Sequence, residues 1–427
     1  MGRSAGAVRR AAVAAVAVVA LGAAGCAADP RPGSPAPSGS RAASGGAAAS
    51  GGASGSASGA PASPLSWEFE HLADFHGRFT DVAVLAEDDV WAVGRESTGA
   101  FDAVLLHHDG TGWEREPLPE ALGNSAGTPA LELIGGGELW SWSSAPSGPL
   151  LTWARWDGVR WSALPHPPPV RGLLPAGVTD PVPKVAASGP DDVWVLASDR
   201  SALHWDGTRW TTTALPHRAA DIAVAGPHDV WAVGHRTTGP GTEPAQGLPY
   251  TQPAAMHWDG GAWRTVDTPR YRFPEPLPAE PGASLDEVVA LDGGEVRAYG
   301  RHDFNHGEGD VEPATEAVRL RWDGARWTEL PQPPGGCGPL VPLGRDDDGG
   351  LLLDGNRYLT AEGRCLKIGR HRLPASTGAR ETSRQSLWLE EVHRVPGTDE
   401  WLGAGHVQVD QSGEPFDAPV VVRLKRR

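Results

Sequence analysis

Short apolar segments alternate with turn residues along positions 66–427, and the pattern is clearest between residues 221 and 263. Two apolar runs, at 222–225 and 230–233, are joined by Gly-Pro-His-Asp, residue types that favour tight turns. A third run ends at Trp258 and a fourth begins at Trp263, with Asp-Gly between them. Asp-Gly between apolar runs is a strong hairpin signal. The pattern therefore predicts a unit of four short antiparallel strands.

This unit repeats about every 50 residues, the period expected of propeller blades. Asp-Val-Trp-Ala-Val-Gly stands at 89–94 and 229–234, and Trp-Asp-Gly-x-x-Trp stands at 156–161, 205–210, 258–263 and 322–327. One unit cannot bury both faces of its sheet, so successive units must pack on one another. Four strands at this period are typical of a β-propeller. The first strands of the units begin near Thr80, Ala130, Lys184, Asp221, Glu287, Pro342 and Glu391.

The seventh unit ends after its third strand, at residues 420–424. A matching fourth strand lies at the other end of the repeat region, because residues 67–72 resemble the fourth strand at 113–118. We therefore predict an all-β fold, a seven-bladed β-propeller with four antiparallel strands per blade, whose last blade is closed by the N-terminal strand. Such closure removes exposed strand edges. The sixth unit is degenerate, with its second strand predicted at 351–353 and no Trp-Asp-Gly hairpin.

The first 65 residues have a different composition. Three arginines precede an apolar run at 11–21, which is typical of a signal peptide over residues 1–25. The Ala-Ala-Gly-Cys that ends at Cys26 resembles a bacterial lipobox, with Ala in place of the usual Leu. The resemblance implies lipidation of Cys26, export, and anchoring at the outer face of the cytoplasmic membrane; the alternative is ordinary cleavage and release. Residues 26–65 are mostly Ala, Gly, Ser and Pro and predict a disordered tether to the propeller at 66–427.

Charge and cysteine content narrow the functional classes. The chain has 37 Lys and Arg against 53 Asp and Glu, a formal net charge of −16. This balance argues against nucleic-acid binding, which needs positive charge opposite phosphate.

The sequence contains two cysteines besides Cys26, which are Cys337 and Cys365. In an exported protein such a pair predicts a disulfide, here across the degenerate sixth unit; two buried thiols are the alternative.

The connections divide into two classes. Those after the first and third strands of each unit are short, whereas those after the second and fourth are long and variable, as at 235–253 and 301–314. Strands alternate in direction, so the long connections share one face, which we term the long-loop face. Long loops on a rigid scaffold usually carry binding. The first residues of the inner strands open onto this face and predict a ring at the channel mouth, formed by Asp81, Lys184, Asp221, Glu287 and Glu391.

The ring has two interpretations. Carboxylates at close quarters favour a cation such as Ca²⁺ or Mg²⁺, or a cationic ligand, and no other cofactor is expected. The alternative is a set of solvated polar residues facing channel water. Other candidate ligands have plainer explanations: the Asp-rich 345–350 segment fits a hairpin turn, and the His- and acid-rich 302–310 segment fits a solvated loop. Histidines recur just before the Asp-Gly hairpin of three units and therefore predict a structural role: the pair His107 and His108, His204, and His257.

The repeats resemble bacterial secreted propellers that carry Asp-Val-Trp-Ala-Val-Gly and His-Trp-Asp-Gly-x-x-Trp units, and more distantly kelch, WD-type and Asp-box propellers. Propellers host many functions, so this resemblance implies a fold more than an activity. We expect a monomeric, membrane-anchored extracytoplasmic module that binds a protein or glycan partner. The alternative is an extracellular carbohydrate-active or other hydrolase with its site at the channel mouth. The sequence favours binding over catalysis.

Overall fold

The computed structural model describes residues 62–97, 102–123, 128–135, 137–144, 151–168, 184–238, 250–273, 279–291, 294–305, 316–333, 336–338, 340–354 and 356–426. The chain divides into two units, residues 1–57 and 58–427, and all described residues belong to the second. Within these ranges the regular structure consists of strands and two short 3₁₀ turns, η1 (Glu120–Leu122) and η3 (Ala375–Thr377). The described part holds no helix long and apolar enough to pass through a bilayer.

The first three blades follow the predicted order of four antiparallel strands each. Blade 1 comprises β2 (Gly77–Ala86), β3 (Asp89–Glu96), β4 (Asp102–His108) and β5 (Trp113–Glu116). Blade 2 comprises β6 (Ala130–Gly135), β7 (Glu138–Ser144), β8 (Leu151–Trp156) and β9 (Trp161–Ala163). Blade 3 comprises β10 (Lys184–Gly189), β11 (Asp192–Ser198), β12 (Ser201–Trp205) and β13 (Trp210–Ala214).

The last four blades complete the ring. Blade 4 comprises β14 (Arg218–Gly226), β15 (Asp229–Thr237), β16 (Thr251–Trp258) and β17 (Trp263–Val266). Blade 5 comprises β18 (Ala279–Leu291), β19 (Glu295–Asn305), β20 (Ala317–Trp322) and β21 (Trp327–Glu329). Blade 6 comprises β22 (Pro342–Arg345), β23 (Leu351–Leu353), β24 (Arg357–Leu359) and β25 (Cys365–Arg370). Blade 7 comprises β26 (Arg384–Arg394), β27 (Trp401–Asp410), β28 (Phe416–Arg426) and β1 (Ala62–Leu72).

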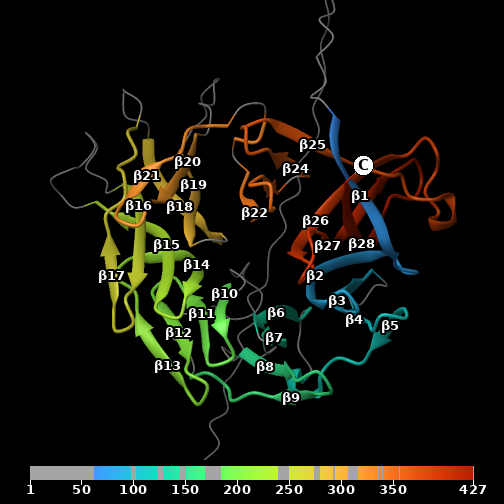
Figure 1. Cartoon of the computed structure of the whole chain (residues 1–427), viewed down its shortest axis with the longest axis horizontal. Helices are drawn as coiled ribbons and strands as arrows, with labels where there is room; N and C mark the ends of the chain where they lie inside the picture. Colours follow the sequence, from blue (N-terminus) through green and yellow to red (C-terminus); the bar gives the residue numbers. More distant parts are fainter. Residues whose placement is uncertain are drawn as a thin grey trace, which may run out of the picture. The chain divides into compact units, whose positions relative to one another are not determined.

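The sheets follow one another around a ring, with the first strand of each blade on the inner side (Figure 1). Each inner strand contacts the next, and β26 returns to β2, so the circle is closed. Every inner strand contains the start that the repeat predicted. The seven-bladed, all-β propeller is therefore confirmed, including the second strand of the degenerate sixth blade at β23.

The closing strand also takes its predicted place. β1 pairs antiparallel with β28, with Trp67 opposite Leu424 and Leu72 opposite Val420 (Figure 1). One feature of the closure went unpredicted: the other edge of β1 pairs in parallel with β25, with Ser66 opposite Gly369. Blades 6 and 7 therefore form one continuous eight-stranded sheet.

Tryptophans explain why the repeat has its sequence. The indole of the Asp-Val-Trp segment is buried in one blade, and both tryptophans of the next blade's Trp-Asp-Gly hairpin pack against it. The ring centroid of Trp91 lies 4.9 Å from that of Trp156 and 5.4 Å from that of Trp161. The same clamp joins blades 2 and 3, 3 and 4, and 4 and 5, around Trp140, Trp194 and Trp231. Buried aromatic contacts thus recur at each of these inter-blade boundaries.

The recurrent histidines hold the same tryptophans from within the blade. Asp89 Oδ1 accepts a hydrogen bond from Trp91 Nε1 at 3.0 Å and lies 2.9 Å from His107 Nε2. The His107 ring stacks on the Trp91 indole at 3.9 Å. Blades 3 and 4 repeat this arrangement through Asp192 and Asp229, with His204 and His257. The structural role predicted for these histidines is confirmed.

The Gly that ends the Asp-Val-Trp-Ala-Val-Gly segment is required by a close approach between strands. It lies opposite a bulge in the inner strand, between Phe79 and Asp81 in blade 1. A Cβ at Gly94 would stand 2.2 Å from the carbonyl oxygen of Arg78, far inside van der Waals contact. Only a residue without a side chain fits there.

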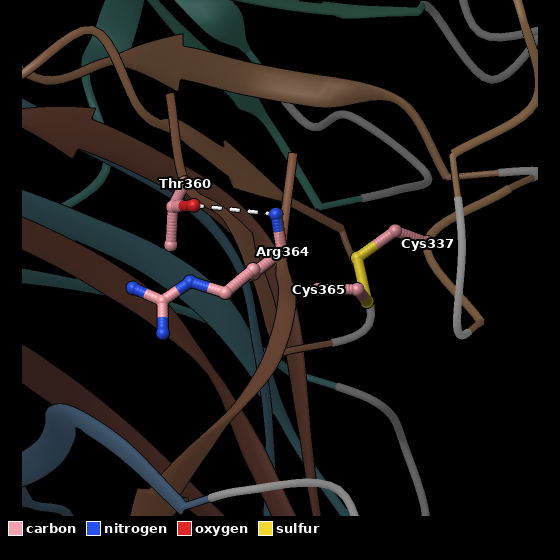
Figure 2. The surroundings of a disulfide bond; sticks show 4 residues. All are labelled: Cys337, Thr360, Arg364 and Cys365. Atoms are coloured by element: carbon pink, nitrogen blue, oxygen red, sulfur yellow. Dashed lines mark hydrogen bonds between the residues drawn. A yellow bond between two sulfur atoms is a disulfide. The ribbon is translucent and has the colours of Figure 1, made fainter. Parts of the chain in front are cut away.

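Blade 6 lacks the tryptophan clamp and is held by a disulfide. Cys337 and Cys365 are bonded, with their Cα atoms 5.8 Å apart, and they join the segment before β22 to the start of β25 (Figure 2). The bond belongs to a small cluster with Leu291, Leu351 and Leu353, between blades 5 and 6. The sulfurs therefore take the place that indoles occupy elsewhere in the ring.

Candidate functional site

The long-loop face carries the candidate site. Three cavities, of about 620, 680 and 860 Å³, are each lined by strand ends and connections that belong to this face. We term them the central cavity, the blade 7 groove and the blade 5 cavity. Two of the longest connections, 239–249 and 306–315, lie outside the described residues.

The central cavity brings together four of the five residues predicted for the ring. Its volume is about 620 Å³, and it is lined by Asp81, Lys184, Asp221 and Glu391. The fifth, Glu287, is exposed and lines the 860 Å³ blade 5 cavity with Tyr299 and Arg301. The predicted set is therefore divided between two cavities. The remaining polar and aromatic lining of the central cavity was not predicted and consists of Thr80, Arg95, Thr128, Glu132, Trp142 and His393.

Two of the ring carboxylates have a structural task as well. Asp81 Oδ2 accepts a hydrogen bond from the backbone N–H of Leu131, in the inner strand of the next blade, at 2.8 Å. Asp221 Oδ2 accepts the equivalent bond from Val288, also at 2.8 Å. Each carboxylate thus ties its own blade to the following one. A ligand at the channel mouth would meet groups that are already held in place.

Enclosure changes the acidity of this cluster. Burial, followed by the charge of Glu391, raises the pKa of Asp81 well above its ordinary value. Burial, followed by the charges of Asp81 and Glu391, raises the pKa of Glu132 in the same way. Burial raises the pKa of Asp221 to about 6, against the opposing effect of Lys184. Burial and neighbouring like charges both favour the neutral form of a carboxyl group. The cavity therefore favours a cation, or a proton, beside these groups.

Glu132 is the important residue that sequence reasoning missed, although a signal was present. It occupies the third position of its inner strand, two residues after Ala130. Other blades have small apolar residues at that position, such as Ala83 and Ala223. His393 is the other exception. Its Nε2 atom lies 3.7 Å from Oε1 of Glu391. A charged or titratable residue in an otherwise apolar repeat position is therefore a marker of the cavity.

The blade 7 groove lies at the outer part of the same face. It has a volume of about 680 Å³ and is formed by blade 7 on one side and by His76 and Ser97 of blade 1 on the other. Trp388 lies in it with 55% of its surface exposed. Arg78 forms an ion pair with Asp417 at 2.7 Å, which joins the two walls.

No metal centre is formed among the described residues, where no group of three or more His, Cys, Asp or Glu side chains has suitable geometry. The Asp-rich segment at 345–350 forms the turn between β22 and β23, where Gly350 N donates to Asp346 Oδ1 at 2.8 Å.

The prediction of a solvated loop from residue 302 onwards is wrong for His302, which lies in β19 and is 2% exposed. Its Nδ1 is 2.9 Å from the Tyr271 hydroxyl.

Comparisons with known proteins give structural likeness only. No protein-family model matches the chain, and no curated protein matches it. Among solved structures, the polysaccharide lyase Uly1 is 8% identical, with a TM-score of 0.44 over 83% of this chain and 91% of that one. The N-terminal domain of Nup159 is 12% identical, with a TM-score of 0.38 over 86% and 97%. A fucose-specific lectin from Aleuria aurantia is 10% identical, with a TM-score of 0.34 over 81% and 96%. Likenesses this weak assign no ligand or activity to this chain.

Proposed function

We propose that this protein is an extracytoplasmic binding module, lipid-anchored through Cys26, whose long-loop face captures a protein or glycan partner. The observation that carries the proposal is the position of the three cavities of about 620 Å³ and more on that face, whereas a cavity of about 120 Å³ lies among the short turns of the opposite face. Cavities with mixed polar and apolar linings on a rigid scaffold are the usual form of a ligand site. The lipid anchor rests on the sequence that ends at Cys26.

The opposite face supports the same conclusion. Its turns use their polar side chains internally, as Asp89, Asp192 and Asp229 do in holding the buried tryptophans. The hairpin carboxylates likewise accept backbone hydrogen bonds from their own turns, as Asp157 Oδ1 does from Val159 and Arg160. Groups committed to the fold are less available to a partner.

The test compares the two faces directly. Residues 27–427 are immobilised and exposed to solubilised envelope, and bound material is crosslinked and identified. A Lys184→Ala and Glu391→Ala double variant and a Trp388→Ala variant each remove part of the long-loop face, whereas Val159→Ala alters a side chain on the other face that is 83% exposed. We expect partner capture to fail with at least one of the first two and to survive the third. Capture that is indifferent to both long-loop variants would refute the proposal.

A second candidate, hydrolysis at the central cavity, is favoured by one observation. Asp81 and Glu132 line the central cavity together with Glu391, and their pKa values are raised, as a general acid requires. In that role Glu132 would donate a proton and Glu391 would act as base or nucleophile. Glu132→Gln would then abolish turnover of a bound glycan without weakening its binding. Release of reducing sugar by wild type, and its loss in the variant, would establish this candidate.

A further inference from the structure

The blade 7 groove exists because two neighbouring blades differ in length. Ahead of the inner-strand bulge, β26 has six residues, 384–389, whereas β2 has three, 77–79. Blade 7 therefore runs about 10 Å further along the long-loop face than blade 1, at about 3.3 Å per residue. The part of blade 7 beyond blade 1 has no neighbouring sheet against it. One face of β26, β27 and β28 is left open there.

Trp388 lies on that open face. Its neighbours Leu387 and Leu389 point to the opposite side, into the core between blades 6 and 7, so the alternation of the strand directs the indole outward. Among the described residues three large hydrophobic side chains are exposed, and only this one is aromatic: Val159, Leu343 and Trp388. In blades 1 to 5 the tryptophans of the repeat are packed between blades. An indole left in water at a cavity wall is more informative than a scattered exposed aliphatic group.

Hydrogen-bonding side chains accompany the indole in register. Arg384 stands opposite Asp410 and Ser386 opposite Gln408, on the same face as Trp388 and two or four residues from it along β26. Asp417 follows on β28, opposite Gln408. Within the described ranges the side chains of Arg384, Ser386, Gln408 and Asp410 form no hydrogen bond or ion pair. Donors and acceptors are thus available beside a flat apolar surface.

The walls of the groove are held by contacts across the two blades. His76 stacks on Phe416 at a centroid separation of 4.4 Å and an interplanar angle of 13°. Arg78 Nε donates to Asp417 Oδ2 at 2.7 Å. The groove is therefore largely organised before any ligand arrives, which lowers the entropic cost of binding.

We propose that the blade 7 groove binds a neutral glycan, with a sugar ring stacked on Trp388. The proposal rests on the binding role proposed above and names its ligand class. A pyranose has one face of C–H groups, which fits an indole, and an edge of hydroxyls, which carboxylate, amide and guanidinium groups bind in pairs. Arg384 is offset by Asp410, and Asp417 by Arg78, so the groove offers no excess positive charge for an anionic polymer. A protein partner would need several large exposed apolar side chains, and among the described residues that line this groove Trp388 is the only one.

The test uses an array of neutral and anionic glycans, followed by affinity electrophoresis in gels that contain the neutral polysaccharide that binds best. We expect Trp388→Ala to weaken binding by about tenfold or more, as truncation of an aromatic anchor typically does. Trp388→Phe should recover part of the loss, and Gln408→Ala with Asp410→Asn should weaken binding as well. Val159→Ala is the matched control, because it removes an exposed apolar side chain away from the groove. Unchanged melting temperatures would exclude unfolding as the cause.

Three results would overturn this inference. The first is the absence of any neutral glycan ligand. The second is binding that survives Trp388→Ala but fails in Lys184→Ala and Glu391→Ala, which would move the ligand to the central cavity. The third is exclusive binding of anionic glycans. In each case the long-loop face can still capture a partner in the envelope experiment, so failure of the glycan assignment is distinguishable from failure of the proposed function.

Discussion

Blades 1 to 5 and blades 6 to 7 meet the same packing requirement with different side chains. In the first arc an indole from each of blades 1 to 4 is buried against two indoles of the next blade. In the second region the position of Trp91 is taken by Leu402 in blade 7 and by Leu352 in blade 6. Both leucines are buried, at 0% and 2% exposure, but neither has the clamp around it.

Blades 6 and 7 replace the clamps by other links, one between residues 28 positions apart and two that join the two ends of the propeller region. These are the disulfide, the parallel pairing of β1 with β25, and an ion-pair group around Arg423. Arg423 stands opposite Leu402, where blade 1 has His107, and is bonded to Glu400 at 2.5 Å and to Glu70 of β1 at 3.1 Å. Local repeats therefore stabilise the arc, whereas the region where β1 meets β25 and β28 depends on links between distant parts of the chain.

Removal of the closing strand should have the largest effect. Deletion of residues 62–72 removes Trp67, which is 2% exposed, and opens the edges of both β28 and β25. We expect loss of the cooperative unfolding transition or a fall in melting temperature of more than about 10 °C. Differential scanning calorimetry measures this, with deletion of residues 27–57 as the control. A melting temperature unchanged by the first deletion would disprove the closure.

Truncation of a clamped indole should come next. Trp231→Ala removes a side chain that is 1% exposed and contacts Trp322 and Trp327 of the following blade. We expect the free energy of unfolding to fall by about 3–5 kcal/mol. Leu402→Ala, at the equivalent position of blade 7, is the matched comparison and should cost about 2–4 kcal/mol. Urea titrations give both values, and a larger loss for the leucine would reverse the contrast between the two regions.

The disulfide should contribute somewhat less. Cys337→Ser with Cys365→Ser opens a loop between residues 28 positions apart, and we expect a loss of about 2–4 kcal/mol. Reductant should lower the melting temperature of wild type to that of the double variant. It should leave the melting temperature of the double variant unchanged. Native-state hydrogen exchange should place the increased opening in blades 5 to 7. Uniform opening around the ring would show that blade 6 has no special dependence on the bond.

The smallest expected effect is a pH dependence in the arc. Burial raises the pKa of Asp221 from 3.8 to about 6, so the folded protein keeps this proton as the pH rises past 3.8 while the unfolded chain loses it. The free energy of unfolding should therefore fall between pH 4 and pH 6, by at most about 3 kcal/mol from this group. Asp81 and Glu132 act in the same direction.

Asp221→Asn should reduce that slope, because the amide oxygen can still accept the Val288 N–H bond and carries no charge. We expect the free energy of unfolding of the variant at pH 7 to equal or exceed that of wild type. Relative to wild type, it should be lower at pH 4 than at pH 7. Urea titrations at the two pH values decide the matter. Equal slopes for variant and wild type would contradict the effect of burial on Asp221.

Most of the fold could be predicted from the repeat because its contacts are local or one blade apart. The Asp-Gly turns, the Gly opposite each bulge and the spacing of the tryptophans all act within about 50 residues. Even the closing strand was recognisable, since residues 67–72 carry the same pattern as other fourth strands. The parallel pairing of β1 with β25 could not be recognised, because the sequence of an edge strand does not specify which second strand it pairs with.

The candidate sites depended on tertiary structure. The repeat aligned Glu287 with Asp81, yet the folded ring divides them between two cavities and places Glu132 among the carboxylates. The exposure of Trp388 follows from the relative lengths of β26 and β2, which lie about 300 residues apart in the chain and meet only when the ring closes. Periodic side chains decide how each blade folds, whereas the arrangement of seven unequal blades decides which side chains face an open space.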